Sequence, residues 1–131
     1  MIPLPSRASL DRLSLAAPPV LIYGLIFWLS SIPGAALSLP TPDAVPHFIA
    51  YAVLAFFLAR AFGPSPRAGW VWACMLAVFA LGALDEFHQY FVPGRFFSLW
   101  DLAFDGAGAG AGTALNLRWR RLKGKTDAAA Q

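Results

Sequence analysis

Four long apolar runs, separated by loops that contain proline, glycine or charged residues, constrain this chain more than any other feature. They cover about residues 15–32, 46–62, 68–84 and 99–117. Each is close to the roughly 20 residues that a helix needs to cross about 30 Å of hydrocarbon, and a lipid-exposed strand would leave backbone groups unpaired. Charged residues make up 13% of the chain, whereas soluble domains carry about 25%. The sequence therefore predicts an all-α integral membrane protein built as a four-helix transmembrane bundle.

The basic residues predict how this bundle is oriented. If all four runs cross the membrane, all but one of the ten Lys and Arg residues lie beside the ends on one side, and Arg95 is the exception. The positive-inside rule then places both termini in the cytoplasm. We expect a cytoplasmic segment at residues 1–17, a transmembrane domain at 18–117 and a basic cytoplasmic tail at 118–131, loose from Thr126 onward. This clustering explains the net charge of +3 without a nucleic-acid partner.

The first apolar run has a second interpretation. Basic residues precede it and the small residues 34–36 follow it, as in a cleaved secretory signal. Trp28 and the Ser30-Ser31 pair fit a retained helix that reaches the membrane interface. A three-span protein would keep the same loops on the outer side, so the predicted sidedness does not depend on the choice.

Polar residues concentrate at the outer side of the predicted bundle. Residues 84–105 alone hold four of the seven acidic residues. Helical spacing places His47 and Tyr51 on one face, and likewise Asp85 and Gln89. Ionisable residues near a span are costly and tend to face a bundle interior or a water-filled cavity. The residues expected to gather at this depth are Asp43, His47, Tyr51, Asp85, Glu86, Gln89, Arg95, Asp101 and Asp105.

Two members of this set are the best candidates for catalysis. Glu86 is the candidate acid, and His47 is the candidate proton carrier because histidine titrates nearest to physiological pH. The candidate substrate-binding residues are Arg95, Gln89, Asp101, Tyr51, Asp105 and Asp43. Arg95 suits an anionic group, since a guanidinium can hold a carboxylate with two parallel hydrogen bonds. A structural alternative stays open, in which Glu86 pairs with Arg95 and His47 donates a hydrogen bond to Glu86 or Asp101.

Metal and cofactor binding find little support in the sequence. A site made of His47, Glu86, Asp101 and Asp105 is chemically possible. However, the chain has no HxxxH or HExxH spacing, and we predict no metal and no cofactor. Cys74, the single cysteine, lies within an apolar run and is predicted to be a packing residue.

The segment GAGAGAG at Gly106–Gly112 and the outer aromatic residues each have two interpretations. The glycine run satisfies a weak dinucleotide-binding pattern, but no strand precedes it. Its small-xxx-small pairs instead favour close helix packing within a bilayer. The aromatic residues favour an interfacial belt over the lining of an access path for lipid or sugar. They are Trp28, Tyr90, Phe91, Phe96, Phe97 and Trp100.

Four segments carry a resemblance to a known family. They are FWLSSIP (Phe27–Pro33), DAVPHFIAY (Asp43–Tyr51), DEFHQYFVPGR (Asp85–Arg95) and SLWDLAFDGAG (Ser98–Gly108). Together they resemble the VanZ-like family of small bacterial membrane proteins over about residues 20–117. The family pattern usually has Asn where this chain has Asp105, so an ionisable group replaces a neutral amide.

The resemblance implies a multi-pass protein of the bacterial cytoplasmic (inner) membrane, with the lipid bilayer as its partner. It also implies an outward polar site for a cell-wall or lipid-linked group and a link to glycopeptide (teicoplanin-type) resistance. If the protein is an enzyme, Glu86 and His47 transfer protons and Arg95 holds an anionic substrate group. One alternative is a non-catalytic accessory protein whose polar cluster locks the helices together. A small transporter is less favoured, because no inverted repeat is visible. The sequence leaves the oligomeric state open.

Overall fold

The computed structural model describes residues 7–36, 44–63 and 69–130, and within these ranges it contains helices and no strands. The four α-helices are α1 (Arg7–Ser30), α2 (Ala44–Phe62), α3 (Gly69–Gln89) and α4 (Leu99–Ala129). A short 3₁₀-helix, η1 (Gly34–Ala36), follows α1. The prediction of an all-α four-helix protein is confirmed.

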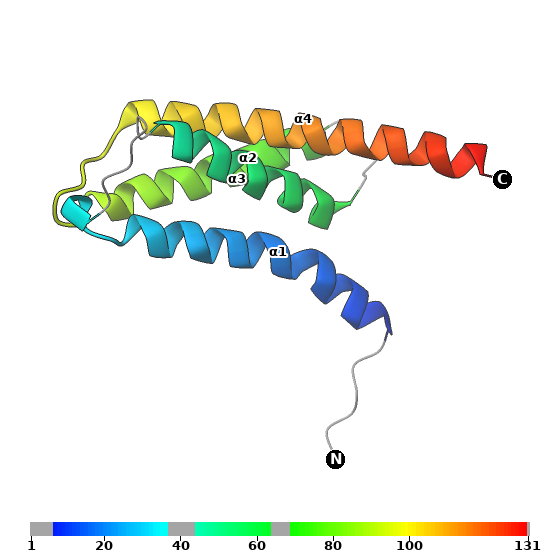
Figure 1. The fold of residues 1–131 in the computed structure, drawn as a ribbon, viewed down its shortest axis with the longest axis horizontal. Coiled ribbons are helices and arrows are strands. Elements are labelled where there is room, and N and C mark those ends of the chain that lie inside the picture. The colour runs from blue at the N-terminus through cyan, green and yellow to red at the C-terminus, as the bar shows by residue number, and fades with distance from the viewer. Residues whose placement is uncertain (1–6, 37–43, 64–68, 131) are drawn as a thin grey trace, which may run out of the picture.

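The helices run alternately up and down. Figure 1 shows the end of α1, the start of α2, the end of α3 and the start of α4 meeting at one end of the molecule. The start of α1 and the end of α4 lie at the opposite end. Helix α2 packs most extensively against α4, and α1 makes its main contacts with α2. This order brings chain segments around residues 30, 47, 86 and 101 to the same end of the bundle.

Three helices are long and apolar enough to cross a membrane. These segments are Leu10–Ser30, Ala44–Phe62 and Gly69–Gln89. Helix α4 is not among them, since its apolar half is mostly glycine and alanine and it continues into a basic segment. It lies beside α2, however, and so shares the depth of a spanning helix.

The two terminal helices extend further than the sequence indicated. Helix α1 begins at Arg7 and contains Pro18 and Pro19, each of which removes a backbone donor from the helix. Figure 1 shows α1 curving toward its N-terminal end. Helix α4 continues to Ala129, so the expectation of a loose tail from Thr126 was wrong. Lys, Arg, Leu and Ala favour helix even where no hydrophobic face is buried.

The glycine run in α4 packs against two helices at once. A Cβ atom at Gly108 would lie 2.5 Å from the backbone oxygen of Phe48 in α2, and one at Gly112 would collide with the carbonyl of Ala52. Gly106 and Gly110 instead face side chains of α3. The predicted packing role is confirmed, and it explains how α4 approaches α2 so closely.

The molecule has an apolar exterior, and its interior combines an apolar core, which includes Leu54 and Val78, with buried polar residues. Asp85, Glu86, Asp105 and Asn116 are each at most 1% exposed. Large apolar side chains point outward along the helices, among them Leu25 at 55%, Trp72 at 66%, Leu76 at 66% and Phe87 at 60%. Lipid rather than water is the solvent that suits such a surface.

Candidate functional site

Three helices bring a histidine and two carboxylates together at the end where the helices meet. The Nδ1 atom of His47, in the first turn of α2, lies 3.0 Å from Oδ1 of Asp105 in α4. The same nitrogen lies 3.8 Å from Oε1 of Glu86 in α3. Both acids are 0% exposed, whereas the His47 side chain is 12% exposed. When Asp105 is ionised it can only accept, and Nδ1 then carries the proton in this bond. We call His47, Glu86 and Asp105 the three-residue cluster.

The start of α4 holds Glu86 in place. The backbone N–H of Ser98 donates to Oε2 of Glu86 over 2.8 Å. Ser98 is also the N-cap of α4, and its Oγ accepts from the N–H of Asp101 at 3.2 Å. A single capping residue therefore begins α4 and fixes one oxygen of the buried acid.

A second polar group lies beside the three-residue cluster and is fully hydrogen-bonded. Ser30 at the end of α1 donates to Oδ1 of Asp85 over 2.5 Å. The amide of Gln89 donates to Oδ2 of the same acid over 3.0 Å. Both oxygens of Asp85 thus have partners, and the bond from Ser30 ties α1 to α3. Tyr23 adds another link between these helices by donating to the carbonyl of Leu81 at 3.2 Å.

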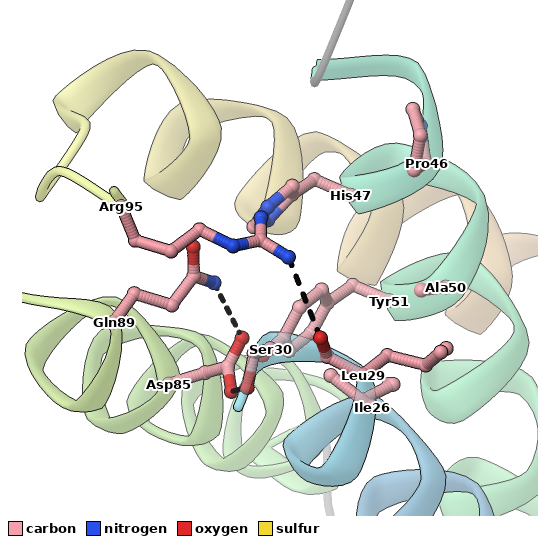
Figure 2. Close-up of a pocket in the computed structure, with 10 residues that line it drawn as sticks. All are labelled: Ile26, Leu29, Ser30, Pro46, His47, Ala50, Tyr51, Asp85, Gln89 and Arg95. Carbon is pink, nitrogen blue, oxygen red and sulfur yellow. Dashed lines mark hydrogen bonds between the residues drawn. The ribbon is translucent and has the colours of Figure 1, made fainter. Parts of the chain in front are cut away.

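A cavity of about 220 Å³ opens between α1, α2, α3 and the loop after α3. Figure 2 shows its lining, with Arg95 reaching from the loop toward the end of α1 and Gln89 turned toward Asp85. The Arg95 guanidinium donates to the carbonyls of Ile32 at 3.3 Å and Leu29 at 3.4 Å. His47 and Tyr51 form part of the opposite wall. Arg95, a permanent cation, and His47 of the cluster therefore line the same cavity.

Three buried polar atoms have no hydrogen-bond partner among the described residues. They are Oε1 of Glu86, Oδ2 of Asp105 and the hydroxyl of Tyr51. The Tyr51 ring lies against His47, with ring centroids 6.3 Å apart and planes 14° from parallel. Unsatisfied buried acceptors are costly, so these atoms mark a place where a proton, a water or a ligand is expected.

A glycine in α3 makes room for Asp105. A Cβ atom at Gly82 would lie 2.7 Å from Oδ2 and 3.1 Å from Cβ of Asp105. Any larger residue would push Asp105 away from His47. The position of Asp105 thus depends on a van der Waals contact with Gly82 as well as on its hydrogen bond to His47.

Most of the predicted site residues meet at this end of the bundle. His47, Tyr51, Glu86, Gln89, Arg95 and Asp105 all belong to the cluster or to the cavity wall. Asp101 is only half-buried, and within residues 44–63 and 69–130 its side chain makes no hydrogen bond. Asp43 lies outside the described residues.

The alternative that Glu86 pairs with Arg95 was wrong. Arg95 instead donates to backbone carbonyls at the end of α1, and the basic group near Glu86 is His47.

The six outer aromatic residues are all exposed, and none lines the cavity. Their placement favours the interfacial belt over an access path.

Sequence reasoning did not identify some residues that hold the helices together. Ser30 was interpreted as an interfacial residue, although its position at the end of an apolar run already placed it at the depth of Asp85.

Near the other end of the bundle, Asn116 donates to the carbonyl of Phe56 at 3.1 Å. Arg120 donates to Asn116 at 2.7 Å and to the carbonyl of Ala59 at 2.9 Å. The spacing of Asn116 and Arg120, four apart on one face, was the available signal.

The apolar exterior, the three membrane-length helices and the buried polar cluster define a multi-pass membrane protein. Residues 24–120 match the family described as VanZ/LLP1, which is most of the chain. The chain therefore belongs to the VanZ/LLP1 family. No match was found among curated proteins or among solved structures.

Proposed function

We propose that this chain is a VanZ-like protein of the bacterial cytoplasmic membrane whose polar site faces outward. The site binds or modifies an anionic group of a cell-wall or lipid-linked molecule, and it contributes to resistance to glycopeptides of the teicoplanin type. One observation carries the proposal: Arg95 and His47 line the same 220 Å³ cavity, beside two buried carboxylates.

The cavity suits an anionic group for reasons of charge and geometry. Within the described part of the chain, Arg95 bonds only to carbonyls, so its positive charge remains available to a ligand. A guanidinium binds phosphate or carboxylate oxygens with two parallel hydrogen bonds. The rest of the wall is largely apolar, with Ile26, Leu29 and Ala50. This combination fits a charged headgroup that continues into a lipid.

His47 is held as a base would be. Asp105 accepts the Nδ1 proton, which fixes the ring and leaves Nε2 as the nitrogen with a free lone pair. A carboxylate that orients an imidazole also stabilises the charged form that appears when it takes up a proton. Asp105 is better suited to this role than the Asn usual in the family, because an amide carries no charge.

The distribution of basic residues supports an outward-facing site. Arg60, Arg118, Arg121 and Lys125 lie toward the end of the bundle remote from the cluster, and the positive-inside rule assigns such an end to the cytoplasm. Arg95 lies at the other end. A site at the outer face is where cell-wall precursors meet the membrane.

A structural lock is the second candidate. The bonds from Ser98 to Glu86 and from Ser30 to Asp85 connect three helices, and they would stabilise the bundle without any ligand. In that case the variants that remove the acids reduce the amount of folded protein. A functional site predicts normal amounts of an inactive protein.

Teicoplanin susceptibility of bacteria that express the chain separates these candidates. We expect the wild type to lower susceptibility, and His47→Ala, Glu86→Gln and Arg95→Ala to abolish this effect while accumulating normally in the membrane. His88→Ala is the matched control: His88 bonds to Ser31 and stacks on Phe27, away from the cavity. Normal accumulation with an unchanged phenotype for the three variants would contradict the proposal.

A further inference from the structure

The charges of the three-residue cluster are unbalanced. Glu86 and Asp105 are fully buried, and the one basic group within 4 Å of them in the described residues is His47. Arg95 donates its hydrogen bonds to α1 instead. Two carboxylates can face one neutral or singly charged imidazole only if protons or a cation supply the missing charge, since burying unpaired carboxylates is expensive.

The ligand atoms have the spacing of a metal site. One atom each from His47, Glu86 and Asp105 can be chosen so that all three lie within 4.8 Å of one another. With metal–ligand bonds of about 2.0–2.2 Å, tetrahedral ligand atoms lie about 3.3–3.6 Å apart. The observed separations of 3.0 and 3.8 Å from Nδ1 fall on either side of that range. Small side-chain adjustments suffice to bring all three atoms around one ion.

The unpaired oxygen of Glu86 points to the same place. Oε1 of Glu86 lies on the side of the carboxylate that faces His47, while Oε2 is occupied by the N–H of Ser98. Oδ2 of Asp105 also has no partner in the described ranges. That oxygen lies against Gly82, whereas Oδ1 of Asp105 and Oε1 of Glu86 are the atoms beside His47. An ion bound by these two oxygens would satisfy the unpaired Oε1 of Glu86 and supply the missing charge, between side chains that are 0% exposed.

We propose that His47, Glu86 and Asp105 bind a divalent transition-metal ion, with zinc as the best match. One imidazole nitrogen and two carboxylate oxygens suit Zn²⁺, and three protein ligands leave a fourth position for water or a substrate oxygen, as in catalytic zinc sites. In the metal-bound state Nδ1 of His47 holds the ion in place of its proton, so Nε2 carries the proton and His47 acts as a ligand rather than as a base. The hydrogen bond between Nδ1 of His47 and Asp105 then belongs to the metal-free state.

This inference deepens the proposed function. It rests on that function for the ligand assigned to the fourth coordination position of the ion. An ion there would polarise an oxygen of the anionic group that Arg95 binds. It differs from the sequence expectation of no metal, which relied on the absence of HxxxH and HExxH motifs. Here the ligands come from three helices, so no short motif could reveal them. Asp105 is the ligand that the family's usual Asn would replace by a weaker one.

Zinc titration of the purified, chelator-treated protein in detergent tests the proposal. We expect the wild type to bind one Zn²⁺ per chain, by calorimetry and by metal analysis after gel filtration. Asp105→Asn and Glu86→Gln keep the side-chain shapes and should weaken binding by more than about 100-fold, because loss of an outer-shell partner alone costs about 10–100-fold. His47→Ala should do the same. His88→Ala, the matched control, should bind as the wild type does.

The outcomes separate this proposal from the proposed function. Absence of stoichiometric binding by the wild type overturns the metal site, and so does binding that survives all three cluster variants or is lost in His88→Ala. Circular dichroism establishes that each variant is folded, and zinc X-ray absorption of the wild type should report one imidazole among oxygen ligands. If zinc fails to bind while His47→Ala loses the resistance phenotype, only the metal proposal fails. If zinc binds at the cluster and the variants keep the phenotype, only the proposed function fails.

Discussion

At the scale of single residues, the molecule buries three carboxylic acids within one small volume and satisfies them unequally. Asp85 has a partner for each oxygen, whereas Glu86 and Asp105 each keep one oxygen unpaired. A buried acid with complete hydrogen bonding is an ordinary structural element. An incompletely bonded one is retained for another reason, such as a ligand or a proton. This difference in hydrogen bonding assigns a structural role to Asp85, and it is the other two acids that the proposed function and the proposed metal site use.

This division predicts the behaviour of Asp85→Ala. The change leaves the buried Gln89 amide without its acceptor and removes the bond between α1 and α3, so we expect a loss of about 1–3 kcal/mol of unfolding free energy. Thermal or denaturant unfolding in detergent measures it. Asp101→Ala is the comparison, because the Asp101 side chain makes no hydrogen bond within the described residues and should cost much less. Equal losses in the two variants would contradict the assignment.

Gly82→Ala should disturb the cluster without removing any polar group. The added methyl would lie 2.7 Å from Oδ2 of Asp105, so the acid must move away from His47. We expect loss of teicoplanin resistance and of zinc binding, together with a destabilisation of about 1–3 kcal/mol from overpacking. Gly24→Ala is the control, since nothing lies within 4 Å of its added methyl. A Gly82→Ala protein with full resistance and zinc affinity would show that Asp105 need not be held in place.

At the scale of helices, close packing of α4 on α2 sets the depth of the whole site. Gly108 and Gly112 bring α4 against the backbone of α2, and this approach puts Asp105, one turn earlier, beside His47. Nearer the other end, Asn116 donates to the carbonyl of Phe56 in α2, and Arg120 donates to those of Ala59 and Arg60 in its last turn. The two contacts hold one pair of helices at both ends.

Gly108→Ala should therefore separate α2 from α4. Its methyl would lie 2.5 Å from the backbone oxygen of Phe48 and 3.0 Å from the nitrogen of Ala52, and a backbone cannot turn aside as a side chain can. We expect a loss of about 1–3 kcal/mol in detergent unfolding. Gly124→Ala in the same helix has nothing within 4 Å and should be neutral or slightly stabilising. Similar unfolding curves for the two variants would be inconsistent with tight packing at Gly108.

The sequence was sufficient to predict the helices and the end at which the site lies. Apolar length gives the spans, and alternating helices place His47, Glu86 and Asp105 at one end. It was not sufficient to predict which side chains bond to one another in the site, because these pairings depend on helix rotation and on how closely the helices approach. The Gly82–Asp105 contact and the path of the loop that turns Arg95 toward α1 fix them. Neither leaves a pattern in hydropathy.

At the scale of the whole molecule, the exterior is far more apolar than that of a soluble bundle. The interior holds ionisable groups beside its apolar core, and the exterior holds leucine and aromatic side chains, including the exposed ring of Trp100 at one end. Trp119, nearer the other end, lies under the charges of Arg60 and Lys123. Aromatic rings at two levels are typical of the two interfaces of a bilayer. The spacing of these levels along α4 supports a crossing by this helix, although its composition is less apolar than that of the other three.

Cysteine accessibility tests both the fourth crossing and the orientation. In a Cys74→Ser background, Ala35→Cys lies in the exposed 3₁₀-helix after α1 and Lys125→Cys lies in the exposed last part of α4. If α4 crosses the membrane and both termini are cytoplasmic, a membrane-impermeant maleimide labels residue 35 in intact cells and residue 125 only after permeabilisation. Labelling of both positions in intact cells would mean that α4 does not cross. Labelling of residue 125 alone would reverse the orientation and place the cluster at the cytoplasmic face, where it could not reach the outer cell wall. The pattern of two labels therefore decides whether the buried acids are positioned for the proposed envelope function.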